Sequence, residues 1–176
     1  MERVPTPDPV SQATEYQDYL VGLVGDEDPA EVQRATPAAW RSIVERSGEL
    51  LAVRPEPGEW SVLECLGHAA DAELVASARY RWILAHNEPP LIGYDQDLWV
   101  DRLHHGQDDP EALLETFEAL RRANLALWAR SSDEDRARVG IHSERGPESY
   151  DLTFRMLAGH DRFHLDQARR ALAALG

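Results

Sequence analysis

The chain has 176 residues, of which 43% are hydrophobic, and both values are typical of one globular domain with a single core. No apolar run approaches the roughly 20 residues that a membrane-spanning helix requires, so the sequence predicts no membrane contact. The formal charge of -14 repels a phosphate backbone and argues against nucleic acid as a partner.

The reactive residue types narrow the expected chemistry and location. All 18 basic residues are arginine, so no lysine is available to form a Schiff base. Cys65 is the single cysteine, and no disulfide can form within the chain. Residues 1–5 show neither the basic and apolar stretches nor the small-residue cleavage site of a secretory signal. We therefore expect a cytoplasmic protein.

The N-terminal third predicts an arm and two helices. Residues 1–10 contain three prolines and little apolar content, so we expect a flexible arm without chemistry, followed by one domain over 11–176. Apolar positions at helical spacing predict a short helix over 11–24. Thr36 followed by Pro37 is typical of a helix start, and this helix is expected to continue to about Val53.

Three longer helices are expected after Pro57. Ser61 and Glu64 have the spacing of a capping box, and Asp109 followed by Pro110 repeats the pattern of a cap before proline. Apolar residues at helical period follow each of these starts and an Asp151 cap. The expected helices span residues 61–87, 109–131 and 151–175.

Two connections of about 20 residues each, 88–109 and 132–150, join these helices. Short segments at 138–142 and 148–150 could pair as a small β-hairpin. Four helices with long connections predict an all-α four-helix bundle. In such a bundle, function lies on inward-facing side chains or on the loops that close one end.

Three histidines are candidates for metal binding. His160 and His164 are four residues apart on the last expected helix, so both imidazoles can reach one ion. His68 lies on an otherwise small or apolar helix face. Each signal has an ordinary alternative, because a histidine pair can be solvated and a lone histidine can be a core residue. Cys65 could face the same cavity, although a single cysteine on an apolar stripe is usually a core residue.

Three separated motifs resemble those of DinB/YfiT-like proteins. The match covers about residues 30–172 and keeps the motifs in the family order. The motifs are Gly58-Glu59-Trp60-Ser61-Val62 with Gly67-His68-Ala69-Ala70-Asp71, the loop Tyr94-Asp95-Gln96-Asp97-Leu98-Trp99, and Gly159-His160-Asp161-Arg162-Phe163-His164-Leu165-Asp166-Gln167.

The resemblance implies a four-helix bundle, often dimeric, that binds one divalent transition metal ion, zinc or nickel, through His68, His160 and His164. Three neutral imidazoles leave open positions where a bound thiol or water has a lowered pKa. Nitrogen ligands also suit copper and ferrous iron, so the sequence leaves the metal open. The apolar helix faces also favour a homodimer, with Trp40, Trp82 and Trp128 as candidates for its surface.

Asp71, Tyr94 and Asp95 are the candidate catalytic residues. Asp71 lies three positions after His68 and could orient an imidazole or accept a proton, although a solvated position is the alternative. Asp95 could instead cap the short helix that follows, and Tyr94 could form a cavity wall. The segment 94–99 is expected to close over the metal. Four further histidines complete the set: His86, His104 and His105 are interpreted as surface residues, and His142 is an outside candidate.

The first functional hypothesis is a metal-dependent transferase. Family members include enzymes that use low-molecular-weight thiols such as bacillithiol or mycothiol, and the resemblance implies transfer of such a thiol to a small-molecule substrate. The second hypothesis is a metal-dependent hydrolase, with Asp71 as proton acceptor. The third is a stress-linked dimer that binds a metal or small ligand without catalysis.

Overall fold

The computed structural model describes residues 6–176. The helices are α1 (Ala13–Val24), α2 (Pro29–Ser47), α3 (Val62–Ala85), α4 (Gln96–Arg102), α5 (Pro110–Ala129), α6 (Asp133–Arg136) and α7 (Tyr150–Leu175). The strands are β1 (Pro90–Leu91), β2 (Val139–His142) and β3 (Gly146–Ser149). Half of the expected N-terminal arm, residues 1–5, lies outside the described residues, and residues 6–10 form no helix or strand.

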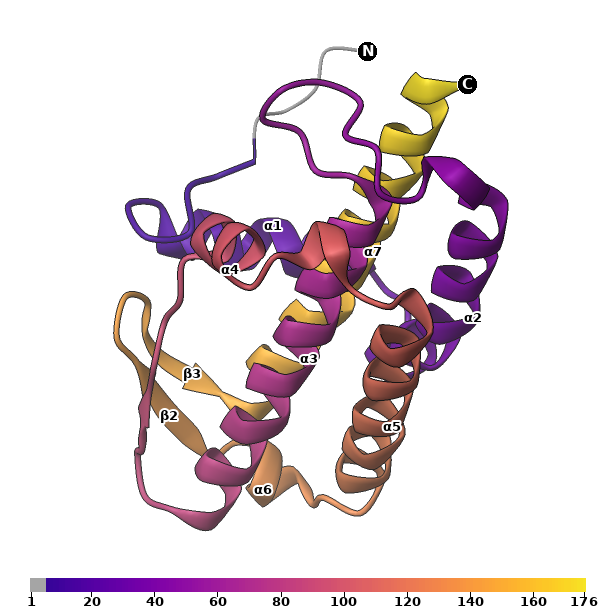
Figure 1. Ribbon diagram of the computed structural model, residues 1–176. Coiled ribbons are helices and arrows are strands. Elements are labelled where there is room, and N and C mark those ends of the chain that lie inside the picture. The colour runs from indigo at the N-terminus through magenta and orange to yellow at the C-terminus, as the bar shows by residue number, and fades with distance from the viewer. Residues whose placement is uncertain (1–5) are drawn as a thin grey trace.

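The expected four-helix bundle is confirmed. Helices α3 and α7 pack against each other in the middle of the molecule, and α2 and α5 complete the bundle (Figure 1). Helix α1 packs on α7, where Gly159 lies against the Leu20 carbonyl. A Cβ atom at position 159 would clash with this backbone, so glycine is required for the close approach. No helix within residues 6–176 is long and apolar enough to cross a membrane.

The expected hairpin is also confirmed. Strands β2 and β3 pair antiparallel, with Val139 opposite Ser149, and β1 pairs parallel to β2, with Pro90 opposite Ile141. The two-residue strand β1 was not predicted, because a segment this short has no detectable alternation. It fixes the start of the 88–109 connection to the hairpin.

The predicted start of α2 was wrong. The helix begins at Pro29, and the Asp28 side chain caps it by accepting from the Ala30 amide. Pro37 therefore lies inside the helix, where it cannot donate to the carbonyl of Gln33. The buried Arg121 guanidinium donates to this carbonyl instead, with Nη1 2.9 Å from the oxygen. A tertiary hydrogen bond thus satisfies the group that proline leaves unpaired.

Other helix ends differ from the prediction by smaller shifts. The predicted capping box at α3 is present, with Ser61 and Glu64 in reciprocal hydrogen bonds. Helix α2 ends at Ser47, before the expected Val53, and a short 3-10 turn follows at Gly48–Leu50. Helix α7 is capped by Ser149, two residues before the expected Asp151 cap.

A buried charged layer separates two apolar clusters of the core. One cluster contains Trp40, Leu66 and Phe117, and the other contains Tyr80, Trp128, Tyr150 and Phe154. Trp40 and Trp128 were expected as candidates for a dimer surface, but this expectation was wrong because both are buried. Trp82 is 42% exposed.

The charged layer is an ion-pair network between helices. Arg121 on α5 donates to the carboxylates of Glu73 on α3 and Asp161 on α7, with nitrogen–oxygen distances of 2.5 to 3.0 Å. Thr36 on α2 donates to the same Asp161. Because Asp161 lies between the candidate metal ligands His160 and His164 on α7, this network fixes the register of these positions against the neighbouring helices.

Candidate metal centre

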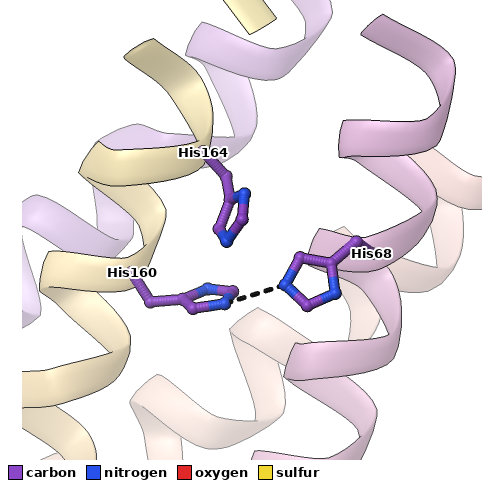
Figure 2. Close-up of side chains that lie close together, drawn as sticks. All are labelled: His68, His160 and His164. Carbon is purple, nitrogen blue, oxygen red and sulfur yellow. Dashed lines mark hydrogen bonds between the residues drawn. The ribbon is translucent and has the colours of Figure 1, made fainter. Parts of the chain in front are cut away.

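The three candidate histidines converge on one point between α3 and α7. His68 projects from α3, and His160 and His164 project from adjacent turns of α7 (Figure 2). One ring nitrogen of each lies within 4.8 Å of those of the other two, which makes this a cluster suited to holding a metal ion. The four-residue spacing on α7 places two imidazoles on one face, as expected.

The distances fit a transition-metal ion. The Nε2 atoms of His68 and His160 are 3.0 Å apart. Two nitrogen ligands at the usual zinc distance, in tetrahedral geometry, lie about 3.3 Å apart, so a small adjustment of the rings would accommodate an ion. The donor set consists of three imidazoles, which suits zinc, nickel, copper or ferrous iron.

The protein environment keeps these imidazoles neutral. Burial lowers the pKa of His68, His160 and His164 well below the ordinary 6.5, and each is further lowered by a neighbouring histidine. A neutral imidazole has a free lone pair, which is the form that binds a metal. The site is therefore prepared for an ion at neutral pH.

Neighbouring side chains orient the rings. His164 Nδ1 lies 2.8 Å from Gln167 Oε1, and this hydrogen bond places the ring proton on Nδ1 and leaves the Nε2 lone pair available. The indole of Trp60 is stacked on His164, with ring centroids 5.9 Å apart, and also contacts His68 at 5.1 Å. Trp60 belongs to the motif that carried the resemblance, but the sequence alone did not predict its contact with the histidines.

A cavity of about 440 Å³ reaches the histidine cluster. His68 and His160 form part of its wall, together with Tyr94 and Asp95 from the connection between β1 and α4. Asp8, Pro9 and Val10 of the N-terminal arm also line it. The arm was expected to carry no chemistry, yet its described part lies beside the candidate site.

Two of the three predicted catalytic residues, Tyr94 and Asp95, line the same cavity as His68 and His160. The ring centroid of Tyr94 is 6.4 Å from that of His68, and burial raises the pKa of the Tyr94 hydroxyl, which stays protonated. Asp95 caps α4, with Oδ1 2.9 Å from the Leu98 amide, which is the alternative that the sequence left open. Their catalytic roles remain predictions.

Asp71 does not contact a ligand histidine. Its Oδ2 lies 2.8 Å from Nε2 of His105, whose Nδ1 lies 2.6 Å from Asp108. His105 was interpreted as a surface residue, and this interpretation was wrong: it is buried, and Gly67 packs so closely on its ring that a Cβ would clash. Hydrogen bonds to both aspartates raise the His105 pKa although burial opposes this. Asp71 thus anchors the connection after α4, and a role in proton transfer remains a prediction.

Several polar residues of the cavity were not predicted. Arg79 on α3 lines the same cavity as His68 and His160. Three residues of the hairpin also line it: His142, Arg145 and Glu148. His142 was only an outside candidate, because its loop could not be placed from the sequence. The hairpin brings it into the cavity, where burial and the two arginines lower its pKa to about 4. Cys65, by contrast, lies in the apolar core.

The fold and the histidine cluster define a class of protein, a helical bundle with a candidate metal centre. The sequence profile of the DinB superfamily matches residues 30–168, and the chain belongs to this family. A protein of Oceanobacillus iheyensis named "Putative metal-dependent hydrolase OB0782" is 26% identical over 124 residues, which cover 70% of this chain and 72% of that protein. A second protein from this organism, "Putative metal-dependent hydrolase OB0413", is 25% identical over 120 residues, or 66% of each chain.

A solved structure extends the likeness to almost the whole fold. It is described as "YfiT from Bacillus subtilis is a probable metal-dependent hydrolase with an unusual four-helix bundle topology". The TM-score is 0.77 at 19% identity, and the match covers 99% of this chain and 94% of that one. This likeness shows the fold. The histidine cluster could hold a metal ion, and the names of the two relatives describe metal-dependent proteins.

Proposed function

We propose that the protein is a metal-dependent enzyme that transfers a low-molecular-weight thiol to an electrophilic small molecule. His68, His160 and His164 would hold one divalent ion, zinc or nickel. The observation that carries the proposal is the opening of the histidine cluster into a 440 Å³ cavity, since a purely structural ion would be enclosed by four protein ligands. A bound ion would act as a Lewis acid that lowers the pKa of a thiol or of water.

The protein itself offers no sulfur nucleophile in the cavity. Cys65 is buried in the apolar core, and burial raises the pKa of its thiol. The chain also lacks lysine. The nucleophile therefore has to enter with a cosubstrate or be water. In the proposed transfer, sulfur forms a bond to carbon, the leaving group departs with its electron pair, and the thiol proton is released to solvent.

The cavity residues would position the substrate. Tyr94 keeps its hydroxyl proton and can donate a hydrogen bond to a developing negative charge. The aromatic rings of Tyr94 and Trp99, whose centroids are 4.4 Å apart, would exclude water from one side. Asp95 holds this segment in place by capping α4.

The test is product identity. Purified protein loaded with zinc or nickel is incubated with monochlorobimane and cysteine, and the products are identified by mass spectrometry. We expect faster formation of the thioether than in buffer, and loss of this acceleration in the His160→Ala variant. A metal-loaded protein that accelerates no thiol transfer, with bacillithiol and mycothiol also supplied, would contradict the proposal.

Metal-dependent hydrolysis is the second candidate, and the names of the two Oceanobacillus relatives favour it. The same open site would then activate water. Release of nitrophenol from small nitrophenyl esters without added thiol, and its loss in His160→Ala, would support hydrolysis over transfer.

A further inference from the structure

Arg79 lies in the cavity wall without a carboxylate partner. Its Nη2 donates to the Ile92 carbonyl at 2.6 Å and lies 3.1 Å from Nε2 of His142. Within residues 6–176, no acidic side chain forms an ion pair with it, whereas Arg145 in the same cavity is paired with Glu148 at 2.6 Å. A partly buried guanidinium without a counter-charge is unfavourable, so its position calls for an explanation.

The hydrogen bonds of Arg79 are also incomplete. A guanidinium carries five N–H donors, and the Nε of Arg79 is buried with no acceptor in the described part of the chain. His142 offers little more, because the Glu144 amide also points at this ring, at 3.2 Å from Nδ1. A neutral imidazole has one acceptor nitrogen, so it can satisfy Arg79 or the amide but not both.

The charge of Arg79 is not cancelled by the other buried groups of the cavity. Burial alone would raise the pKa of Glu148, but hydrogen bonds from Arg145 lower it. Arg145 and Glu148 are therefore both ionised, and their charges cancel each other. The remaining acidic groups of the cavity are exposed and lie at its mouth: Asp8, Asp95, Asp97 and Glu144. The cavity thus combines an inner positive charge with an acidic entrance.

We propose that Arg79 binds the carboxylate of a small substrate whose reactive end lies toward His68 and His160. A guanidinium can donate two parallel hydrogen bonds to a carboxylate, which would supply the missing negative charge. The acidic entrance repels multiply charged anions, so the substrate carries one carboxylate on this side. Its orientation toward the histidines rests on the proposed function, whereas carboxylate binding at Arg79 does not.

The ionisation of the cavity agrees with this assignment. Burial and the positive charge of Arg145 lower the pKa of Arg79, which still remains protonated at neutral pH. A bound carboxylate would offset both effects.

The test measures binding of sodium butyrate by titration calorimetry at constant ionic strength, with the zinc-loaded and the metal-free protein. We expect saturable binding to both, at least tenfold weaker in Arg79→Met. Arg81→Met is the matched control, because Arg81 lies on the same helix outside the cavity and also donates to a backbone carbonyl, that of Ser77. Its affinity for butyrate should equal that of the wild type.

Other probes make the result decisive. Butyramide has the same shape without charge and should not bind, and inorganic phosphate should bind more weakly than butyrate. Equal binding of butyramide would overturn the proposal even if Arg79→Met failed to fold. Binding that disappears on metal removal would place the carboxylate at the histidines and overturn it too. Absence of zinc uptake with intact butyrate binding would instead contradict only the proposed function.

Discussion

At the scale of single residues, the metal assignment depends on three imidazoles that share one ion. We expect purified protein to contain about one transition metal per chain. His160→Ala removes one of three ligands and should lower occupancy at least tenfold, as measured by elemental analysis after dialysis. His142→Ala is the matched control, because His142 lines the cavity but lies outside the cluster. Full occupancy in His160→Ala would remove the assignment.

The same burial predicts how the metal-free fold responds to acid. The pKa of His68, His160 and His164 is lowered in the folded chain, so the unfolded chain binds more protons as the pH drops below 6.5. The free energy of unfolding should therefore decrease as the pH is lowered below about 6.5. It should stop decreasing once the pH lies below the folded-state pKa values of these histidines. Urea denaturation at pH 7.5 and 5.5 measures the slope.

His164→Phe provides the comparison for this pH effect, since it removes one titrating group and keeps a ring of similar size. Its slope should be shallower than that of the wild type, and an equal slope would contradict the prediction. Metal should also dissociate in acid, because protons compete for the ligand nitrogens. A site still filled at pH 4 would indicate carboxylate ligands.

At the scale of the element, the connection between β1 and α4 links fold and chemistry. Tyr94→Phe should leave metal content unchanged and reduce turnover about tenfold, because the variant loses only a hydroxyl donor. Asp95→Ala should cost about 1 kcal/mol of stability by removing the α4 cap. Asp95→Asn keeps a capping oxygen and is the control. Full activity in Tyr94→Phe and Asp95→Ala together would show that this segment takes no part in the reaction.

The buried ion-pair network gives a stability prediction for the packed helices. Arg121→Met leaves the carboxylates of Glu73 and Asp161 without their counter-charge and should lower the free energy of unfolding by about 3–5 kcal/mol. Arg41→Met breaks ion pairs at the surface and should cost less than about 1 kcal/mol. Urea denaturation of the metal-free proteins separates the two, and equal losses would contradict a special role for the buried layer.

At the scale of the whole molecule, the sequence predicted the features that depend on local signals and missed those that depend on tertiary contacts. The Ser61 capping box depends only on residues of α3, and the spacing of His160 and His164 depends only on residues of α7. The sequence was therefore sufficient to predict both. Pro37 was misread as a helix start because its compensation comes from Arg121, 84 positions later in the chain. Chain periodicity carries no information about such a partner.

The cavity wall was unpredictable for the same reason. His142 and Arg145 lie on a hairpin whose position depends on pairing of β2 with β1 and β3, and no local pattern fixes that docking. His105 carried no signal of burial, since its carboxylate partner Asp71 lies on another helix. Resemblance to a family supplied the ligand set, whereas the polar surroundings that govern specificity required the structure.

We expect the whole molecule to assemble as a homodimer. Leu74 and Trp82 lie about two turns apart on α3 and are 52% and 42% exposed, which is unusual for large apolar side chains on a central bundle helix. A second copy is the simplest cover for them. Trp82→Glu should shift the sedimentation coefficient from dimer to monomer at micromolar concentration, with Val53→Glu, an exposed apolar residue outside α3, as control. A wild-type protein that sediments as a monomer would contradict this expectation, and the exposed face of α3 would then need another partner.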